Sequence, residues 1–366
     1  MLIKNVKIVN FNETINNADL IIEDNKIKNI IKKDGYGKKI LMPGLIDTHI
    51  HGFMNDDVMD SKEAVERISI NLAKNGITSF MPTAMTNSWE KILKSLNHIS
   101  KANYKGAKYI GTHIEGPYIG IEKKGAHKPE WLKTATKENI DELLKASEYK
   151  LKKISFDPKM LNNELIKYLV TKNVIPSIGH SAATYKQAQD AYDAGATCTC
   201  HLWNAMSGVD SRNPGLAEAS LENKNVYAEM IIDFQHICPE TINFSIKHKG
   251  IDKIMCISDA IKPAYIEDGP SISGGIKINK KGLLITLDGT NTIAGSGICI
   301  YDSVKFLRQL NYSFNDIVKL TSYNSAKNCN LNNTALIKEG YDADFIILDE
   351  NTLDLEEVYI NGIKIK

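Results

Sequence analysis

Two histidines of this 366-residue chain stand one residue apart, where a short apolar run ends in polar residues. Residues 47–52 read DTHIHG, and the run 45–48 leads directly into His49. Side chains two positions apart leave the same face of an extended chain, so His49 and His51 can bind one ion together. This spacing indicates a metal-dependent hydrolase.

Carboxylate and imidazole side chains also follow other apolar runs. Glu115 follows the third run, His180 follows the fifth, and His201 lies at the end of the sixth; six of the nine histidines fall at or near such ends. Unpaired imidazoles and carboxylates crowded together would carry a desolvation cost without compensation. We therefore predict that Glu115, His180 and His201 hold Zn²⁺ or Fe²⁺ through nitrogen and oxygen donors, with one position open for water.

Asp259 follows the eighth run and is the candidate proton carrier. A divalent ion lowers the pKa of bound water from 15.7 to about 7, which makes water a nucleophile at neutral pH. Asp259 is placed to take the proton of this water and to deliver it to a leaving amine. The alternative that stays open is an aspartate that caps a helix.

Eight β-rich runs with helical segments between them predict an α/β fold, a (β/α)8 TIM-type barrel. The runs are 45–48, 77–81, 109–114, 154–156, 174–178, 197–202, 226–232 and 253–258. We expect a catalytic barrel domain over residues 45–336, with a β-hairpin insertion near 276–287 and its turn at 279–282. Residues 1–44 and 337–366 are expected to build one small β-sandwich together. Ser61 and Thr136 are predicted helix N-caps, and Gly195 a helix stop.

The composition argues against several other classes of function. The formal net charge is +1 and no long run of one sign occurs, so neither nucleic acid nor a membrane surface is an expected partner. No signal peptide or 18-residue apolar run is found, so we expect a cytoplasmic protein. The six cysteines are scattered and are expected to be reduced. In the run 197–202, alternation predicts Cys198 and Cys200 on one face, with Thr199 and His201 on the other.

Seven motifs occur in an order that resembles the N-acetylglucosamine-6-phosphate deacetylase family of the amidohydrolase superfamily. They are PGLIDTHIHG (43–52), HIEGPY (113–118), KKGAH (123–127), GHS (179–181), HLWNAM (201–206), RNPG (212–215) and SDA (258–260). Together they cover nearly the whole chain.

The resemblance implies roles for individual residues. It implies that Glu115, His180 and His201 hold the metal, and that His49 and His51 give capacity for a second ion, so that one or two ions bind per subunit. The substrate-binding set that it implies is Arg212 and the amides near Asn204 and Ala205 for a phosphate, with His127 and His236 for the sugar and the acetamide carbonyl. In related enzymes this arginine can come from the neighbouring subunit, which implies a homodimer.

The activity that the resemblance implies is hydrolysis of the acetamide of N-acetyl-D-glucosamine 6-phosphate, a small phosphorylated amino sugar, to glucosamine 6-phosphate and acetate. The alternatives are the galactosamine isomer, another amidohydrolase, or a binding protein without catalysis. Amidohydrolases of cyclic amides use a modified lysine at the end of the fourth strand, whereas residues 155–158 read SFDP here.

Two segments depart from the family pattern. Phe234 stands where the family commonly has glycine, and we expect its ring to alter the sugar pocket. The glycine-rich stretch 288–299 is longer than usual, and we interpret it as a plain turn rather than a phosphate loop because no Gly-Lys-Ser/Thr follows.

Overall fold

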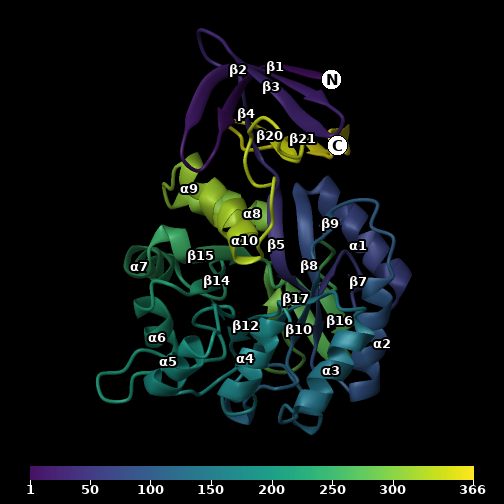
Figure 1. Ribbon diagram of the computed structural model, residues 1–366, viewed down its shortest axis with the longest axis vertical. Helices are drawn as coiled ribbons and strands as arrows, with labels where there is room; N and C mark the ends of the chain where they lie inside the picture. Colours follow the sequence, from purple (N-terminus) through teal and green to yellow (C-terminus); the bar gives the residue numbers. More distant parts are fainter.

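The computed structural model describes residues 1–366, and its largest element is a barrel of eight parallel strands (Figure 1). In chain order these are β5 (Leu45–Ile50), β8 (Ile77–Met85), β10 (Thr112–Glu115), β11 (Leu151–Phe156), β12 (Ile175–Ile178), β13 (Cys198–Thr199), β14 (Tyr227–Ile231) and β15 (Ile254–Ile257). Each predicted run overlaps one of them, so the predicted (β/α)8 fold class is confirmed. The short strand β9 (Lys108–Tyr109) pairs beside β8, and β6 (Gly52–Phe53) pairs with β7 (Asp56–Asp57).

One helix follows each barrel strand. In order they are α1 (Lys62–Lys74), α2 (Trp89–Ser100), α3 (Lys137–Ala146), α4 (Asn163–Thr171), α5 (Tyr185–Asp193), α6 (Leu216–Glu222), α7 (Pro239–Lys249) and α8 (Ile300–Gln309). The predicted caps are present: the Ser61 side chain accepts a hydrogen bond from the Ala64 N–H, and Thr136 accepts one from Asn139. Gly195 follows α5 in the left-handed region at φ +117°, as a helix stop requires.

The barrel closes where the last strand meets the first. The Asp259 N–H donates to the His49 carbonyl at 2.9 Å, and the Ser258 hydroxyl donates to the buried Asp47 carboxylate at 2.5 Å. Burial raises the pKa of Asp47 to about 7. This seam fixes Asp259 beside the histidines that end β5.

Strands from both ends of the chain form one seven-stranded sheet outside the barrel. They are β1 (Leu2–Val9), β2 (Thr14–Glu23), β3 (Lys26–Lys32), β4 (Lys39–Pro43), β20 (Phe345–Asp349), β21 (Leu355–Ile360) and β22 (Ile363–Lys364). Figure 1 shows both termini in this domain, at one end of the molecule. Only Gly44 separates β4 from β5, so the barrel strands run away from the small domain and end at the opposite rim.

The insertion after β15 is larger than predicted. It is a four-stranded antiparallel sheet of β16 (Gly269–Ser273), β17 (Ile276–Lys281), β18 (Leu284–Leu287) and β19 (Ile293–Ser296). The inner strands β17 and β18 are the predicted hairpin, but the predicted turn at 279–282 begins three residues too early, because β17 continues to Lys281. The chain reverses at Gly282, whose φ is +61°.

The barrel and the small domain meet through the segment after α8. It contains α9 (Phe314–Val318), a π-helical turn (Lys319–Tyr323) and α10 (Asn324–Asn328). Tyr323 stacks on Phe11 of the small domain with ring centroids 3.8 Å apart. None of the helices combines the length and the apolar character needed to cross a membrane.

Lys108 is an electrostatic contact between the barrel and the small domain, and it yields the first prediction. Its Nζ lies 2.6 Å from Asp344 Oδ2, and the Asp344 side chain is only 2% exposed. Lys108→Met leaves that carboxylate buried without its cation, so we expect the free energy of unfolding, measured with urea, to fall by about 2 kcal/mol. Adding Asp344→Asn should recover part of the loss. An unchanged urea midpoint in Lys108→Met would contradict a stabilising pair.

Candidate active site

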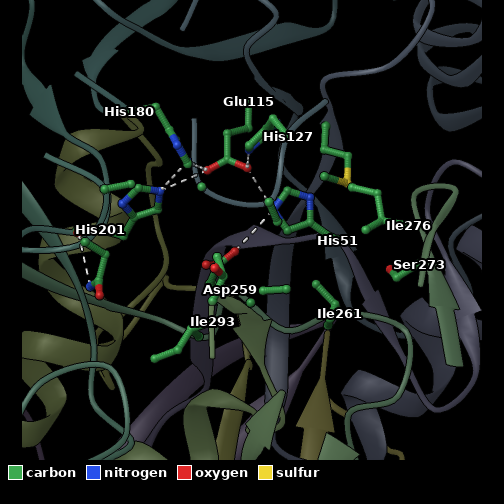
Figure 2. A pocket seen from close by; sticks show the side chains of 18 of the residues that line it. His51, Glu115, His127, His180, His201, Asp259, Ile261, Ser273, Ile276 and Ile293 are labelled. Carbon is green, nitrogen blue, oxygen red and sulfur yellow. Dashed lines mark hydrogen bonds and ion pairs between the residues drawn. The ribbon is translucent and has the colours of Figure 1, made fainter. Parts of the chain in front are cut away.

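A pocket of about 350 Å³ opens at the carboxyl ends of the barrel strands (Figure 2). Nine of the eleven predicted site residues line it: His51, Glu115, His127, His180, His201, Asn204, Ala205, His236 and Asp259. His49 lies fully buried beside this set, and Arg212 lies in an exposed loop. The remainder of the wall includes side chains of the inserted sheet, among them Ser273, Ile276 and Ile293.

Glu115, the last residue of β10, lies at the floor of the pocket between two groups of histidines. Its Oε1 is 3.1 Å from His180 Nε2 and 3.0 Å from His201 Nε2, and these two nitrogens are 3.0 Å apart. Figure 2 shows both rings directed at this carboxylate. The three predicted ligands of the first ion are therefore brought together.

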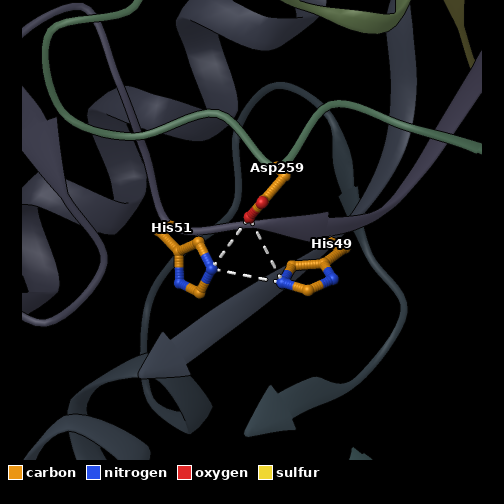
Figure 3. Close-up of side chains that lie close together, drawn as sticks. All are labelled: His49, His51 and Asp259. Carbon is orange, nitrogen blue, oxygen red and sulfur yellow. Dashed lines mark hydrogen bonds and ion pairs between the residues drawn. The ribbon is translucent and has the colours of Figure 1, made fainter. Parts of the chain in front are cut away.

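The second group consists of His49, His51 and Asp259 (Figure 3). The Nε2 atoms of the two histidines are 3.2 Å apart, and Asp259 Oδ1 lies 3.4 Å from His49 Nε2 and 3.2 Å from His51 Nε2. Glu115 reaches this group as well, because its Oε2 is 3.3 Å from His51 Nε2. One carboxylate thus lies within reach of both groups.

The hydrogen bonds on the far edges of the rings show that these residues fit a cation. His180 Nδ1 lies 2.9 Å from the Lys123 carbonyl, and His51 Nδ1 lies 2.9 Å from the Thr83 carbonyl. A carbonyl only accepts, so in the neutral form each ring carries its proton on Nδ1 and turns the Nε2 lone pair toward carboxylate oxygens. Acceptors that face acceptors need a cation between them, either a proton or a metal ion.

The distances between the candidate donor atoms also fit a bound metal ion. Two donors at 2.0–2.1 Å from a tetrahedral zinc ion lie about 3.3 Å apart. The distances among donor atoms in the two groups run from 3.0 Å, between His180 and His201, to 3.4 Å, between His49 and Asp259. The residues of both groups therefore fit a divalent ion with nitrogen and oxygen ligands.

The buried carboxylates are held in the ionised form. Burial raises the pKa of Asp259, but the neighbouring His49 and His51 outweigh it and lower this pKa to about 2. Burial likewise opposes ionisation of Glu115, and the charges of His180 and His49 hold its pKa well below the usual range. Conversely, the hydrogen bond with Glu115 overcomes burial and raises the pKa of His201 to about 9. The floor of the pocket is thus an anionic environment that attracts positive charge.

Four residues of the site have a strained backbone conformation. His180, His201, Ala205 and Asp259 all have positive φ, at 46°, 24°, 49° and 50°. Residues other than glycine rarely adopt this region, and such strain is typical of functional sites, where the surrounding packing enforces it.

The prediction that Cys200 and His201 lie on opposite faces of a strand is wrong. Strand β13 stops at Thr199, so the alternation of faces does not continue to Cys200 and His201. Cys200 Sγ lies 3.9 Å from Glu115 Oε1, the same oxygen that His201 contacts at 3.0 Å. Burial raises the pKa of Cys200 well above its usual value, which keeps the thiol protonated.

His236 is fixed in the pocket wall by a neighbouring carboxylate. Its Nδ1 is 2.7 Å from Asp233 Oδ2, which leaves Nε2 as the free nitrogen. Phe234 between them adopts φ +59°, and its ring packs on Phe306 with centroids 4.7 Å apart rather than lining the pocket. The expectation that this ring alters the pocket is wrong, because a left-handed residue turns it away.

Arg212 is the predicted substrate residue that the fold does not bring to the pocket. It is exposed in the loop before α6, where its backbone N–H donates to Asp210 Oδ1 at 2.9 Å. Its guanidinium makes no hydrogen bond or ion pair within the chain. In contrast, Asn204, Ala205 and His127 all line the pocket.

The stretch 288–299 is more than the plain turn that the sequence predicts. Its residues from Thr292 to Gly295 line the pocket, and most of them belong to strand β19. The alternation of small and apolar residues there is weak, so a strand could not be inferred from periodicity.

Two charged residues of the site were not identified from the sequence. Glu229 on β14 has Oε2 at 3.3 Å from His49 Nδ1, and its Oε1 pairs with Lys153 on β11. Both side chains are fully buried. A signal was present for Glu229, which is the single charge in the strand YAEMI and must find a partner when buried. Lys153 gave no such signal, because Lys152 and Ser155 make its strand polar as well.

The comparisons with known proteins agree with this site. The model of the Amidohydrolase family matches residues 40–364. N-acetylglucosamine-6-phosphate deacetylase of Lysinibacillus sphaericus is 30% identical, over 100% of this chain and 98% of its own length. N-acetylgalactosamine-6-phosphate deacetylase of Escherichia coli O157:H7 is 28% identical, over 88% of this chain and 87% of its own.

A solved structure extends the similarity to the fold. It is an aspartate-to-alanine mutant of N-acetyl-D-glucosamine-6-phosphate deacetylase from Mycobacterium smegmatis, in complex with N-acetyl-D-glucosamine-6-phosphate. It is 25% identical, with a TM-score of 0.94, over 100% of this chain and 99% of that one. The family model matches most of the chain, and the barrel rim carries the set of histidines and carboxylates described above. This chain therefore belongs to the amidohydrolase family.

Proposed function

We propose that this chain hydrolyses the acetamide of N-acetyl-D-glucosamine 6-phosphate to D-glucosamine 6-phosphate and acetate. The observation that carries the proposal is the arrangement around Glu115, where oriented imidazoles and the ionised Asp259 share the floor of one pocket. Similarity to deacetylases of phosphorylated amino sugars over the full chain supports the substrate.

The amidohydrolase family is metal-dependent, and a bound divalent ion supplies a Lewis acid and activates water. Glu115, His180 and His201 would hold this ion, and His49, His51 and Asp259 would hold a second one. Zinc suits the nitrogen and oxygen donors best, and Fe²⁺ is the alternative.

Asp259 is the proposed proton carrier. With its pKa lowered to about 2 by His49 and His51 against the effect of burial, it is an anion at neutral pH and can accept a proton from the attacking water. The same carboxyl then delivers the proton to the departing nitrogen. His127 and His236 are proposed to contact the sugar and the acetamide carbonyl from the pocket wall.

Arg212 is proposed to bind the phosphate of the substrate in the pocket of a second subunit. Its exposed position outside its own pocket supports this arrangement, as does the absence of an ion pair within the chain. The proposed assembly is therefore a homodimer. The galactosamine isomer remains a second candidate substrate, because a relative from Escherichia coli O157:H7 bears that name.

Removal of metal tests the metal centre. At a free ion concentration of about a hundred times Kd, binding stabilises the folded state by about 2.7 kcal/mol. The entropy of unfolding grows with chain length, so for 366 residues chelation should lower Tm by about 3 to 4 °C. Activity on N-acetylglucosamine 6-phosphate should be lost and should return with Zn²⁺. An apoprotein, shown to be metal-free by elemental analysis, that is as active as the loaded protein would contradict the metal centre.

Asp259→Asn tests the proton carrier. We expect kcat to fall by about 10²- to 10⁴-fold, because the amide cannot accept the proton of water. The ion held by Glu115, His180 and His201 should remain, as measured by metal content. Substrate binding measured by calorimetry should persist, which separates a chemical defect from a folding defect. Full turnover in this variant would refute the assignment.

Arg212→Ala tests the phosphate contact and the dimer. A charge-assisted contact contributes about 1.5 to 3 kcal/mol, so kcat/KM should fall about 10- to 150-fold for the phosphorylated sugar and remain unchanged for the unphosphorylated one. Equal wild-type rates on the two sugars would overturn the assignment.

Mixing the two variants tests the source of the arginine. A dimer of one Arg212→Ala subunit and one Asp259→Asn subunit has one complete site if the arginine serves the neighbouring subunit. After random exchange, about a quarter of wild-type activity should return. A mixture no more active than its components would place the arginine in its own subunit's site.

A further inference from the structure

A buried ion pair lies directly behind the histidines of the pocket. Lys153 and Glu229 have side chains 1% and 0% exposed, and they project into the barrel from β11 and β14. Neither lines the pocket, so neither is in a position to contact the substrate. The pair nevertheless contacts His49, because Glu229 Oε2 lies 3.3 Å from His49 Nδ1.

The contacts of this pair converge on the end of β5. Lys153 Nζ donates to the Thr48 carbonyl at 2.7 Å and also pairs with Glu229 Oε1. The lysine therefore fixes both the backbone just before His49 and the carboxylate behind the His49 ring. Its positive charge, together with His49, overcomes the effect of burial and lowers the pKa of Glu229 to about 2.

His49 is thereby oriented by its two ring nitrogens. Nδ1 donates to Glu229, so the Nε2 lone pair on the opposite edge faces His51 and Asp259 (Figure 3). A carboxylate behind a metal-binding histidine fixes its tautomer and makes its free nitrogen a better ligand.

The other candidate ligands are held by weaker partners. Backbone carbonyls accept from His180 and His51, and the buried Nδ1 of His201 has no partner at all. Of the four candidate histidine ligands, His49, His51, His180 and His201, only His49 has a carboxylate at its second ring nitrogen. His49 belongs to the second group, not to the trio of Glu115, His180 and His201.

A structural explanation alone does not account for the pair. Replacing a buried ion pair by apolar side chains of similar volume is often neutral or stabilising, so stability gives little reason to keep one. We propose that Glu229, held in place by Lys153, is a positioning residue that makes His49 a ligand and so determines whether a second ion binds. This inference rests on the proposed metal-dependent function.

The test compares metal binding by two variants with metal binding by the wild type. Glu229→Gln keeps the shape of the side chain but removes its charge. The double variant Lys153→Met with Glu229→Met removes both charges and keeps the interior apolar, so it guards against simple misfolding. Each full-length protein is titrated with Zn²⁺ against a chromophoric chelator, and the Co²⁺ derivative is examined by absorption spectroscopy. Asp344→Asn is the matched control, since it also removes a buried carboxylate paired with a lysine, outside the pocket.

In both variants we expect the Kd of the second ion to rise about 10- to 100-fold, while the Kd of the first ion stays at the wild-type value. The Co²⁺ spectrum should change to that of a protein with one ion. Asp344→Asn should match the wild type in both measurements.

Three results would overturn the proposal. They are two ions bound with wild-type affinity in both variants, equal weakening of both ions, and a wild-type protein that binds only one ion. Failure of the proposed function is distinguishable, because it would be seen as wild-type protein that binds its ions normally and leaves the acetamide of the amino sugar intact.

Discussion

The two oxygens of one buried carboxylate lie among five imidazoles at the floor of the pocket. Every histidine nitrogen that faces Glu115 lies 3.0–3.5 Å from it, although the five rings come from four different segments of the chain. In a low-dielectric interior such a cluster is stable only if its charges are balanced, because buried charges interact strongly and solvent screens them little. The positions of the surrounding strands, loops and inserted sheet follow from keeping this carboxylate buried and surrounded.

The barrel satisfies this requirement because its parallel strands all end at one rim. Glu115 can meet His180 and His201 since each is carried to the same level by its own strand. The strands alone do not complete the geometry, because His180 and His201 leave them in left-handed conformations that turn the rings inward. The inserted sheet of β16 to β19 then supplies apolar side chains along one side of the pocket, which keeps water from surrounding the charged floor.

The parts that could be predicted from sequence are those that repeat locally. Apolar runs followed by polar residues locate the barrel strands, and a common rim then brings Glu115 and the histidines together. Contacts one layer below the rim follow no such pattern, so the link from Lys153 through Glu229 to His49 required the arrangement of β11 against β14. Strand β16 was missed because its glycine, proline and serine residues carry little β-propensity. The end of β13 was also missed, and with it the orientation of His201, since alternation cannot show where a strand stops.

The position of β4 in the small sheet has a consequence for how this chain folds during its synthesis. In the small sheet β4 lies between β1 and β20, and β20 belongs to the last part of the chain. During synthesis one edge of β4 therefore stays unpaired until the whole barrel and its insertion have emerged from the ribosome. An open strand edge is a template for association with other chains, and pairing between distant segments forms slowly. The N-terminal strands thus depend on the rapid folding of the barrel beside them, and nascent chains that stall within the barrel are the ones most exposed to aggregation.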